Sequence, residues 1–363
     1  MTVYSINKIL NKNMAQNMKA LVNMSVVDRI GYFFNKVNER SELTYGYRDS
    51  YDSGGDEALG ETVEYFHPHI LYDDRMRYIM QNIVLSDMSM DNIICNTIIS
   101  HFYGGRGIHQ ILTRDPNPET ALVDFERLLI DKEYEMTIRK NIDDALSLGL
   151  GVYGTTELRT SLYGASNTWV AETRNTDRNA DKINILLWVA GFIPRGITKR
   201  MAGVNSLQEM YNILTEIEGV GSYYGYHCST SNSVNPNINI NHDERFCVPG
   251  PGARLTLDML FPPDCGIPHG DRVIWFRENY KDLIGDIPLN KNEWNMTVKG
   301  TKIFEDEQNE LKTYGCEVGL CQFGVYTRLS DNRSLINKRK VARADGGIME
   351  YFFNNNYEQN ALF

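Results

Sequence analysis

Three closely spaced glycines constrain the centre of this chain more tightly than any other feature of the sequence. Gly219 and Gly221 flank a valine, and Gly225 follows four residues later. Glycine has no Cβ atom, so it permits positive φ angles and close approach of backbones. The apolar residues that precede Gly219 recur at helical spacing, beginning at Leu214. The spacing predicts a helix, a tight turn, and a second helix that begins at about Ser222.

The pattern L-x-x-I-x-G-V-G-x-x-x-G is that of a helix-hairpin-helix, which we expect at residues 207–228. The first N–H groups of a helix have no partner within it, so the start of the second helix can bind a DNA phosphate. An ordinary corner between two helices, with glycines for steric reasons alone, is an equally good interpretation of the turn by itself. The DNA-contacting residues that the motif predicts are Gly219, Val220, Gly221, Ser222 and Tyr223.

Helical periodicity extends over most of the remaining chain, which predicts a mainly α fold. Val26, Ile30 and Phe33 fall on one face of a helix. The residues from Ser86 to Met90 separate two further helices, and Pro118 is expected to open a long helix over 118–151.

The few strand signals lie mostly near the end of the sequence, where residues 320–329 (LCQFGVYTRL) are compatible with a strand. Ser206 followed by Glu209 is a capping box and predicts the start of the helix before the glycine turn. We expect a helical domain at residues 25–285 and a C-terminal extension at 286–363.

Charge and cysteine content limit the kinds of partner that this chain takes. The net charge of −10 argues against bulk electrostatic binding of nucleic acid, although one basic face can exist on an acidic protein. No apolar run approaches the length of a membrane span and no secretory signal is present, so we expect a cytoplasmic protein without a membrane partner. The six cysteines are expected to be thiols.

No cofactor or metal is expected. The segment 149–154 matches G-x-G-x-x-G, but a helix rather than a strand precedes it, which argues against dinucleotide binding. The pairs His67 with His69, His227 with Cys228, and Cys316 with Cys321 have no second cluster at a zinc-site spacing.

An aspartate follows the glycine turn at a distinctive distance. Asp243 lies 22 residues beyond Gly221. In this respect the chain resembles the helix-hairpin-helix DNA glycosylases, which have a catalytic aspartate about that far beyond their hairpin. Those enzymes flip a base out of DNA and act on it in a pocket. Members that cleave the strand carry a lysine where this sequence has Tyr223, so the resemblance does not predict a Schiff-base lyase.

Two segments together resemble a narrower family. GVGSYYGYH at 219–227 and DERFCVPGPGA at 243–253 look like the phage α-glutamyl/putrescinyl thymine pyrophosphorylases, also called amino acid:DNA transferases. The segment FFNKVNERSEL, which contains Glu39 and Arg40, resembles the N-terminal helix of that family.

A further segment resembles the family only loosely, through Asn82 and Asp87. The arginine expected between them is absent, since Val84 and Leu85 occupy that stretch.

The resemblance implies an enzyme of DNA base hypermodification in a helix-hairpin-helix glycosylase-like fold. It would displace pyrophosphate from pyrophosphorylated 5-hydroxymethyluracil in DNA with an amine. The implied partners are double-stranded DNA that carries the modified base and an amino acid or polyamine donor, in the cytoplasm of a phage-infected bacterial host. Two other functions stay open: a monofunctional glycosylase that uses Asp243 to cleave the N-glycosidic bond, and a non-catalytic DNA-binding module.

The catalytic candidates are the adjacent acids Asp243 and Glu244. A carboxylate here can accept a proton from the attacking ammonium and stabilise positive charge at the exocyclic carbon. Asp243 is the first choice, and Glu244 is the alternative because adjacent residues in a turn usually point apart. The alternative for Asp243 is a structural one, in which it caps the helix or turn before Phe246.

Glycines also precede the segment that contains Arg254, which makes it a candidate pyrophosphate cradle. A tight turn shaped by the two prolines is the alternative. The residues of the predicted cradle are Gly250, Gly252, Ala253 and Arg254. The basic clusters that either follow the DNA backbone or form a solvated face contain Arg195, Lys199 and Arg200, and Lys338, Arg339, Lys340 and Arg343.

Overall fold

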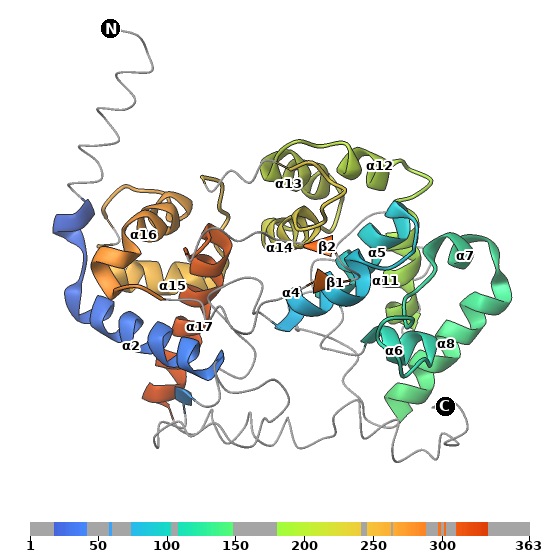
Figure 1. Ribbon diagram of the computed structural model, residues 1–363, viewed down its shortest axis with the longest axis horizontal. Coiled ribbons are helices and arrows are strands. Elements are labelled where there is room, and N and C mark those ends of the chain that lie inside the picture. The colour runs from blue at the N-terminus through green and yellow to red at the C-terminus, as the bar shows by residue number, and fades with distance from the viewer. Residues whose placement is uncertain are drawn as a thin grey trace, which may run out of the picture. The chain divides into compact units, whose positions relative to one another are not determined.

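The computed structural model is mainly helical, as the sequence predicts (Figure 1). In the part of the chain that the structure describes, the strands are β1 (Thr297–Val298) and β2 (Thr301–Lys302), which pair with each other. The described residues are 18–41, 58–59, 74–102, 108–147, 180–240, 245–262, 264–287, 297–298, 301–302 and 310–332.

The chain divides into two compact units. The first unit comprises Met1–Asp74, Glu244–Thr297 and Lys302–Lys338, and the second comprises Arg75–Asp243, Val298–Thr301 and Arg339–Phe363. The expected division into a domain at 25–285 and an extension at 286–363 stays a prediction.

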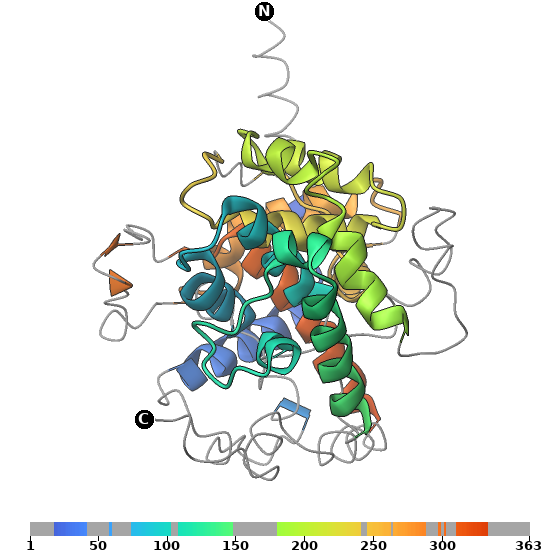
Figure 2. The same cartoon turned by 90° about the vertical axis from the view of Figure 1, so that its right-hand side faces the viewer.

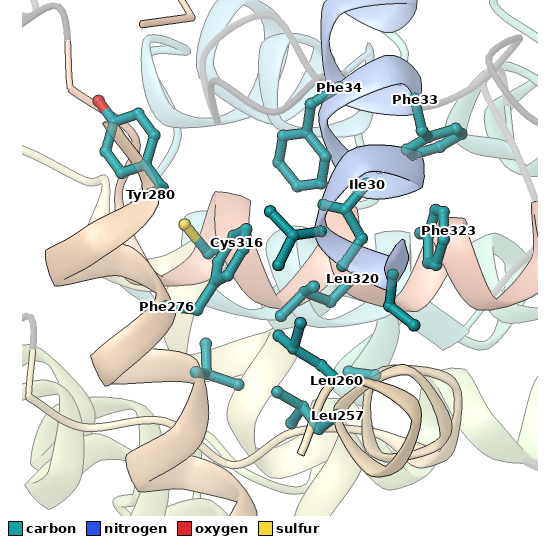
Figure 3. Packing of buried hydrophobic residues seen from close by; sticks show 14 of the residues in the cluster. Ile30, Phe33, Phe34, Leu257, Leu260, Phe276, Tyr280, Cys316, Leu320 and Phe323 are labelled. Atoms are coloured by element: carbon teal, nitrogen blue, oxygen red, sulfur yellow. The ribbon is translucent and has the colours of Figure 1, made fainter. Parts of the chain in front are cut away.

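In the part of the first unit that the structure describes, four long helices surround an apolar core (Figure 3). Helix α2 contributes Ile30, Phe33 and Phe34, which are fully buried and lie against α16 and α17. Burying each phenylalanine contributes roughly 1.5–3 kcal/mol. The helices of this unit are α2 (Met24–Ser41), α15 (Pro251–Leu260), α16 (His269–Ile284) and α17 (Thr313–Asp331).

The strand expected at 320–329 is wrong, because these residues belong to α17. Cys316, Leu320 and Phe323 are buried at spacings of four and three residues, which places them on one face of a helix. The ring of Phe323 packs edge-on against Phe33 with centroids 5.9 Å apart. Helical periodicity and burial therefore outweigh the local preference of valine and tyrosine for strands.

The second unit contains the other described helices, and its helices α5 (Met90–Phe102) and α14 (Ser222–Ser233) are buried over most of their length. Helix α5 packs against α14, and α14 packs against α13. In both Figure 1 and Figure 2 the yellow-green helices α12, α13 and α14 lie together. The helices are α4 (Asp74–Tyr78), the π-helix η3 (Ile79–Val84), α5 (Met90–Phe102), α6 (Ile108–Thr113), α7 (Phe125–Ile130), α8 (Lys132–Ser147), α11 (Ala180–Ala190), α12 (Ile197–Ala202), α13 (Leu207–Thr215) and α14 (Ser222–Ser233).

Buried asparagines on α5 hold the segment before α7 in place. The Asn96 side chain donates to the carbonyl of Val123 at 2.8 Å and accepts from its N–H at 3.0 Å. Asn92 accepts from the N–H of Phe125 at 2.7 Å. These bonds satisfy backbone groups of a buried extended segment, which would otherwise lack partners.

The long helix expected to open at Pro118 and to cover 118–151 is wrong in two respects: residues 118–124 are not helical, so the first helix begins at Phe125, and a break at Asp131 divides α7 from α8. Asp124 caps α7 by accepting from the N–H of Arg127, and Asp131 accepts from the N–H groups of Glu133 and Tyr134 at the start of α8. The backbone of Asp131 is extended, so α7 and α8 are separate helices. Aspartate side chains compete with the helix for backbone N–H groups, and that competition decides the boundaries here.

Several other expectations are confirmed. The break at 86–90 lies between η3 and α5, and Ser206 caps α13 by accepting from the N–H of Glu209 at 3.1 Å. All six cysteines are free thiols. Within the described residues, no helix has both the length and the apolar character needed to span a membrane.

Candidate functional site

The glycine turn joins α13 to α14 as expected. Gly219 has a φ of 92°, which favours glycine. Gly221 has a φ of −74° and a ψ of 166° and is the N-cap of α14, so of the two glycines that flank Val220 only Gly219 has a positive φ. Among the described residues, nothing lies within 4 Å of a Cβ atom built at Gly221, so their packing does not require a glycine here.

Gly225 allows α13 and α14 to approach closely, as predicted. A Cβ atom at Gly225 would lie 2.6 Å from Cγ2 of Thr215 and 3.4 Å from the ring of Tyr211. Val220, between the two glycines of the turn, is 9% exposed, so its side chain packs inside the protein. Packing alone therefore accounts for the small residue at position 225 and for the apolar residue at position 220.

The start of α14 is open to an anion. Gly221 and Ser222 are exposed, no side chain in the part of the chain that the structure describes caps the helix, and its first turn contains no acid. The helix's own hydrogen bonds begin with the N–H of Gly225, which donates to the carbonyl of Gly221 at 2.9 Å. The earlier N–H groups point out of the end of the helix, where the helix dipole favours negative charge.

Basic side chains lie beside this turn. The guanidinium of Arg200 on α12 contacts the carboxylate of Glu216 at 2.8 Å, which brings α12 next to the turn. Lys199 is exposed on the same short helix. Arg195 is tied back, since its Nε donates to the carbonyl of Gly191 at 2.9 Å and its guanidinium lies over the Phe192 ring.

The charges around the turn are balanced. Residues 191–222 contain three basic side chains, named above, and the three acids Glu209, Glu216 and Glu218. The surface is therefore not a strongly positive patch, and binding of a phosphate here depends on directed N–H groups more than on net charge.

A buried polar cluster was missed in the sequence. His101 on α5 lies between Arg75 and Ser231: Arg75 Nη1 donates to His101 Nδ1 at 3.4 Å, and His101 Nε2 donates to Ser231 Oγ at 2.5 Å. The ring of His227 lies 6.2 Å from that of His101 and 4.3 Å from that of Tyr223. The contacts thus connect the first turn of α14 to Arg75.

Burial keeps both histidines of this cluster neutral at neutral pH. It lowers the pKa of His101 well below its usual value, and it lowers the pKa of His227 to about 3. The positive charge of Arg75 acts in the same direction on both. Burial also raises the pKa of the neighbouring Cys228 thiol to about 12, so this cysteine is not a thiolate nucleophile.

One sequence signal could have revealed the cluster. The residues of α14 from Tyr224 to Ser233 are all buried, although they include a run of serine, threonine and asparagine with no apolar face. Several of these side chains bond to carbonyls of the preceding turn, for example Thr230 to Tyr226 at 2.9 Å. A polar helix without amphipathic periodicity is expected either in solvent or at a built site.

The predicted pyrophosphate cradle has internal contacts. The N–H of Gly250 donates to the buried carboxylate of Glu317 at 2.8 Å. A Cβ atom at Gly252 would lie 2.5 Å from Sγ of Cys321, so this glycine is needed where α15 packs on α17. Arg254 is exposed and its Nε donates to the carbonyl of Pro249 at 2.9 Å, while Ala253 is buried.

The carboxyl group of Glu317 lies at the start of α15, where the sequence predicts that a pyrophosphate binds. Its side chain is fully buried, and burial raises its pKa to about 7 against the opposing hydrogen bond from Gly250. A pyrophosphate role for this segment stays a prediction. If it is right, Arg254 is the residue of the predicted set that faces solvent.

The structure does not place every predicted residue. Asp243 and Glu244 lie outside the described residues, as do the side chains of Glu39 and Arg40 and the basic cluster at 338–343. Their roles stay predictions.

Asn82 lies in the π-helix η3, where its side chain donates to the carbonyl of Tyr78 at 3.1 Å. Asp87 is exposed in the bend that follows. A short π-helix often marks a functional segment, and this one directly follows α4, which contains Arg75.

Comparison with protein families gives one match. The model of the family described as "5-hmdU DNA kinase, helical domain" matches residues 71–334, more than half of the chain. No curated protein and no solved structure matches the chain. The matched range contains the glycine turn, the buried polar cluster and the segment from Asp243 to Arg254. The chain therefore belongs to the family of the 5-hmdU DNA kinase helical domain.

Proposed function

We propose that this chain binds double-stranded DNA that carries a modified thymine-position base and transfers an amine to that base. The substrate is pyrophosphorylated 5-hydroxymethyluracil, and the donor is an amino acid or a polyamine. The observation that carries the proposal is the open start of α14 after the glycine turn, inside the range that matches a family named for a DNA base. The place of action is the cytoplasm of a phage-infected bacterium.

Recognition of the DNA strand begins at the glycine turn. The N–H groups of Gly219, Gly221 and Ser222 bind one backbone phosphate and set the position of the strand. Lys199 lies beside them, and Arg200 exchanges its contact with Glu216 for a second phosphate. A helix-hairpin-helix of the glycosylase type would then present the flipped base to a pocket nearby.

The transfer is a displacement at the exocyclic methylene carbon. The amine nitrogen forms a bond to this carbon, the bond from carbon to the pyrophosphate oxygen breaks, and pyrophosphate leaves with the electron pair. Asp243 accepts the proton that the ammonium loses, with Glu244 as the alternative. Gly250, Gly252, Ala253 and Arg254 form the proposed pyrophosphate site, in which Arg254 supplies a planar fork for phosphate oxygens.

A second candidate follows from the printed name of the family. The chain would hold DNA for phosphorylation of the hydroxymethyl group of 5-hmdU, which denotes 5-hydroxymethyldeoxyuridine. The 363 residues contain no G-x-x-x-x-G-K-[ST] pattern, the loop that binds nucleotide phosphates in P-loop kinases. Both candidate functions act on 5-hydroxymethyluracil in DNA. The kinase candidate adds a phosphate to the hydroxymethyl group, whereas amine transfer removes a pyrophosphate from it.

Product analysis separates the two candidates. The protein is incubated with DNA that carries pyrophosphorylated 5-hydroxymethyluracil and a mixture of amino acids and polyamines. Nucleoside mass spectrometry and pyrophosphate release are then measured together. A parallel reaction contains DNA with 5-hydroxymethyluracil and ATP.

Amine transfer predicts an aminated nucleoside and an equal amount of pyrophosphate in the first reaction. A phosphorylated nucleoside in the second reaction, with no change in the first, would support the kinase candidate and overturn amine transfer. Release of free base with an abasic site would instead indicate a glycosylase.

A further inference from the structure

Three charged or titratable side chains connect α15 to the start of α16, two neighbouring helices of the first unit (Figure 1). Nε2 of His269 donates to Oδ1 of Asp258 at 2.9 Å, and Nη1 of Arg272 donates to the same oxygen at 2.9 Å. The Arg272 side chain is 4% exposed, whereas those of His269 and Asp258 are 32% and 42% exposed. Asp258, His269 and Arg272 form the α15–α16 cluster, which is buried on its arginine side and open to solvent on its histidine side.

The hydrogen bonds of the α15–α16 cluster fix the histidine ring at one nitrogen. Nε of Arg272 donates to the carbonyl of Ile267 at 2.8 Å, so the guanidinium holds Asp258 from inside the protein. An ionised carboxylate only accepts hydrogen bonds, so His269 Nε2 carries a proton. Among the described residues, no group makes a hydrogen bond with His269 Nδ1. The imidazole is therefore held through Nε2 and presents Nδ1 to a ligand.

A tether between the two helices explains only part of this arrangement. The ion pair of Arg272 with Asp258 already joins α15 to α16 and provides the buried guanidinium with its counter-charge. His269 adds a second donor to an oxygen that has a donor, and a partly exposed ion pair contributes little to stability. A carboxylate that orients an accessible imidazole is, however, the arrangement that acid–base chemistry uses.

The α15–α16 cluster lies beside Arg254, a residue of the predicted pyrophosphate cradle. Arg254 and Asp258 are exposed and four residues apart on α15, so they lie on the same face of the helix. Nε of Arg254 is held by the carbonyl of Pro249 at 2.9 Å. A Cβ atom at Gly270, the residue after His269, would lie 4.0 Å from Cδ of the same proline. Arg254 and His269 therefore border one short stretch of chain.

An anion at this place depends on side chains. The N–H of Gly250 at the start of α15 already donates to Glu317. Arg254 offers a guanidinium fork, and a protonated His269 offers an N–H donor at Nδ1. Both groups suit the oxygens of a pyrophosphate.

We infer that His269 contacts the pyrophosphate that leaves the modified base and donates a proton to it, beside Arg254, with Asp258 and Arg272 as positioning residues. The inference rests on the proposed function, in which pyrophosphate leaves from the exocyclic methylene carbon. As the carbon–oxygen bond breaks, the leaving oxygen takes the electron pair and gains negative charge. The Nδ1 proton of the imidazolium moves to the pyrophosphate, and the neutral imidazole regains a proton from solvent.

The first measurement is the affinity of the full chain for inorganic pyrophosphate, by titration calorimetry. His269→Ala and Arg254→Ala are each expected to weaken binding about 10-fold, the scale of a lost hydrogen bond to a charged group. Asp271→Asn, which changes an exposed acid in the first turn of α16, is the control and should not weaken binding.

The second measurement is the rate of pyrophosphate release from the pyrophosphorylated duplex at saturating amine. His269→Ala is expected to slow release about 100-fold or more, the scale of a lost acid–base group. Added imidazole should restore part of the rate, because it supplies the missing proton donor, and a merely structural histidine would show no such rescue. Unchanged affinity and unchanged rate in His269→Ala would overturn the inference. A slower rate with full pyrophosphate affinity and no rescue would overturn it as well.

A second variant covers the case in which His269→Ala does not fold. His269→Gln keeps a donor for Asp258 and cannot transfer a proton. We expect it to fold and to release pyrophosphate as slowly as a variant without the imidazole. A full rate in His269→Gln would overturn the inference.

Asp258→Asn tests the positioning role. It keeps an acceptor oxygen for His269 and Arg272 and removes the charge. We expect it to slow pyrophosphate release, and to have no further effect when it is combined with His269→Ala. Effects that add in the double variant would indicate that Asp258 is merely structural and overturn its role.

The outcome is separable from that of the proposed function. Wild-type protein that transfers no amine but binds pyrophosphate, with a loss in His269→Ala, would overturn amine transfer and leave the pyrophosphate contact of His269 intact. Full amine transfer with no effect of His269→Ala would do the reverse. Absence of both amine transfer and pyrophosphate binding would overturn both.

Discussion

The two glycines that flank Val220 differ in backbone conformation, although the sequence motif does not distinguish between them. Gly219 has a left-handed backbone, whereas Gly221 has an extended backbone and open space where a Cβ atom would be. Gly219→Ala is expected to lower the free energy of unfolding by about 1–2 kcal/mol, because φ is positive. Thermal or urea unfolding measures this loss.

Gly221→Asp makes folding and DNA binding change in opposite directions. An aspartate at the N-cap accepts hydrogen bonds from the first N–H groups of α14, and its negative charge interacts favourably with the helix dipole. The free energy of unfolding therefore rises by roughly 0.5–1 kcal/mol. The same carboxylate occupies and repels the site proposed for a phosphate, so DNA affinity falls. Gln208→Glu on α13 adds an equal charge away from the turn as a control. A stabilised variant with unchanged affinity would show that the turn is only a corner.

Glu317 gives the first unit a defined pH dependence. Its folded-state pKa of about 7 lies above its usual value of 4.5, so the folded state holds the proton more tightly than the unfolded state. The contribution of Glu317 to stability is therefore lost as pH rises from about 4.5 through 7, by roughly 3 kcal/mol at most. Glu317→Gln keeps the acceptor for Gly250 and removes the charge.

The measurement is the difference in unfolding free energy between Glu317→Gln and wild type, at pH 5.5 and pH 8. The variant should gain on wild type as pH rises. Glu278→Gln, an exposed position of α16, is the control. A difference that does not change with pH would mean that the carboxylate is ionised in the folded state at little cost.

At the scale of elements, α13 and α14 approach each other most closely where Gly225 faces Thr215. Gly225→Ala would place a methyl group 2.6 Å from Cγ2 of Thr215 and force the helices apart, which typically costs about 1–3 kcal/mol. Thr215→Ser removes Cγ2 and keeps the hydroxyl, which donates to the carbonyl of Tyr211. The double variant should recover part of the loss in urea unfolding, and simple additivity of the two effects would contradict this account.

Helices with a clear apolar face could be predicted from the sequence. Their ends are less predictable, because these depend on side chains that compete with backbone carbonyls for the N–H groups of the helix. The face of α2 and the cap of α13 were predicted correctly from spacing. The two aspartates that divide α7 from its neighbours, Asp124 and Asp131, look like ordinary surface residues in the sequence. The strand expected within α17 failed because β-branched and aromatic residues packed into a helical core.

At the scale of the whole molecule, chemistry assembled from distant residues was the hardest to predict. The glycine turn is local, so its position and its close helix approach could be predicted from the sequence. The relay from Arg75 through His101 to Ser231 joins three separate helices, and no local spacing connects them. From the sequence, His227 could be considered only as a weak candidate for a metal ligand. Its burial, which keeps it neutral, depends on the tertiary structure and is not visible in the local sequence.

Asp243 is the proposed proton acceptor of the reaction as a whole. Amine transfer breaks a carbon–oxygen bond at the exocyclic methylene and leaves the N-glycosidic bond intact, whereas a glycosylase does the reverse. An amine is mostly protonated at neutral pH, so a nearby carboxylate must take its proton. Asp243→Asn keeps the size and loses the charge. It should bind DNA like wild type and slow amine incorporation by roughly 100-fold or more.

The assay follows pyrophosphate release and the aminated nucleoside in parallel, with Glu244→Gln as the matched control. If Asp243→Asn keeps full turnover while Glu244→Gln loses it, the proton acceptor is Glu244. If neither substitution slows incorporation, the proton is taken elsewhere and the catalytic assignment of this pair is wrong. Equal loss of DNA binding and turnover in Asp243→Asn would point to a structural cap before Phe246, because a proton acceptor acts on the chemical step and leaves binding of the duplex unchanged.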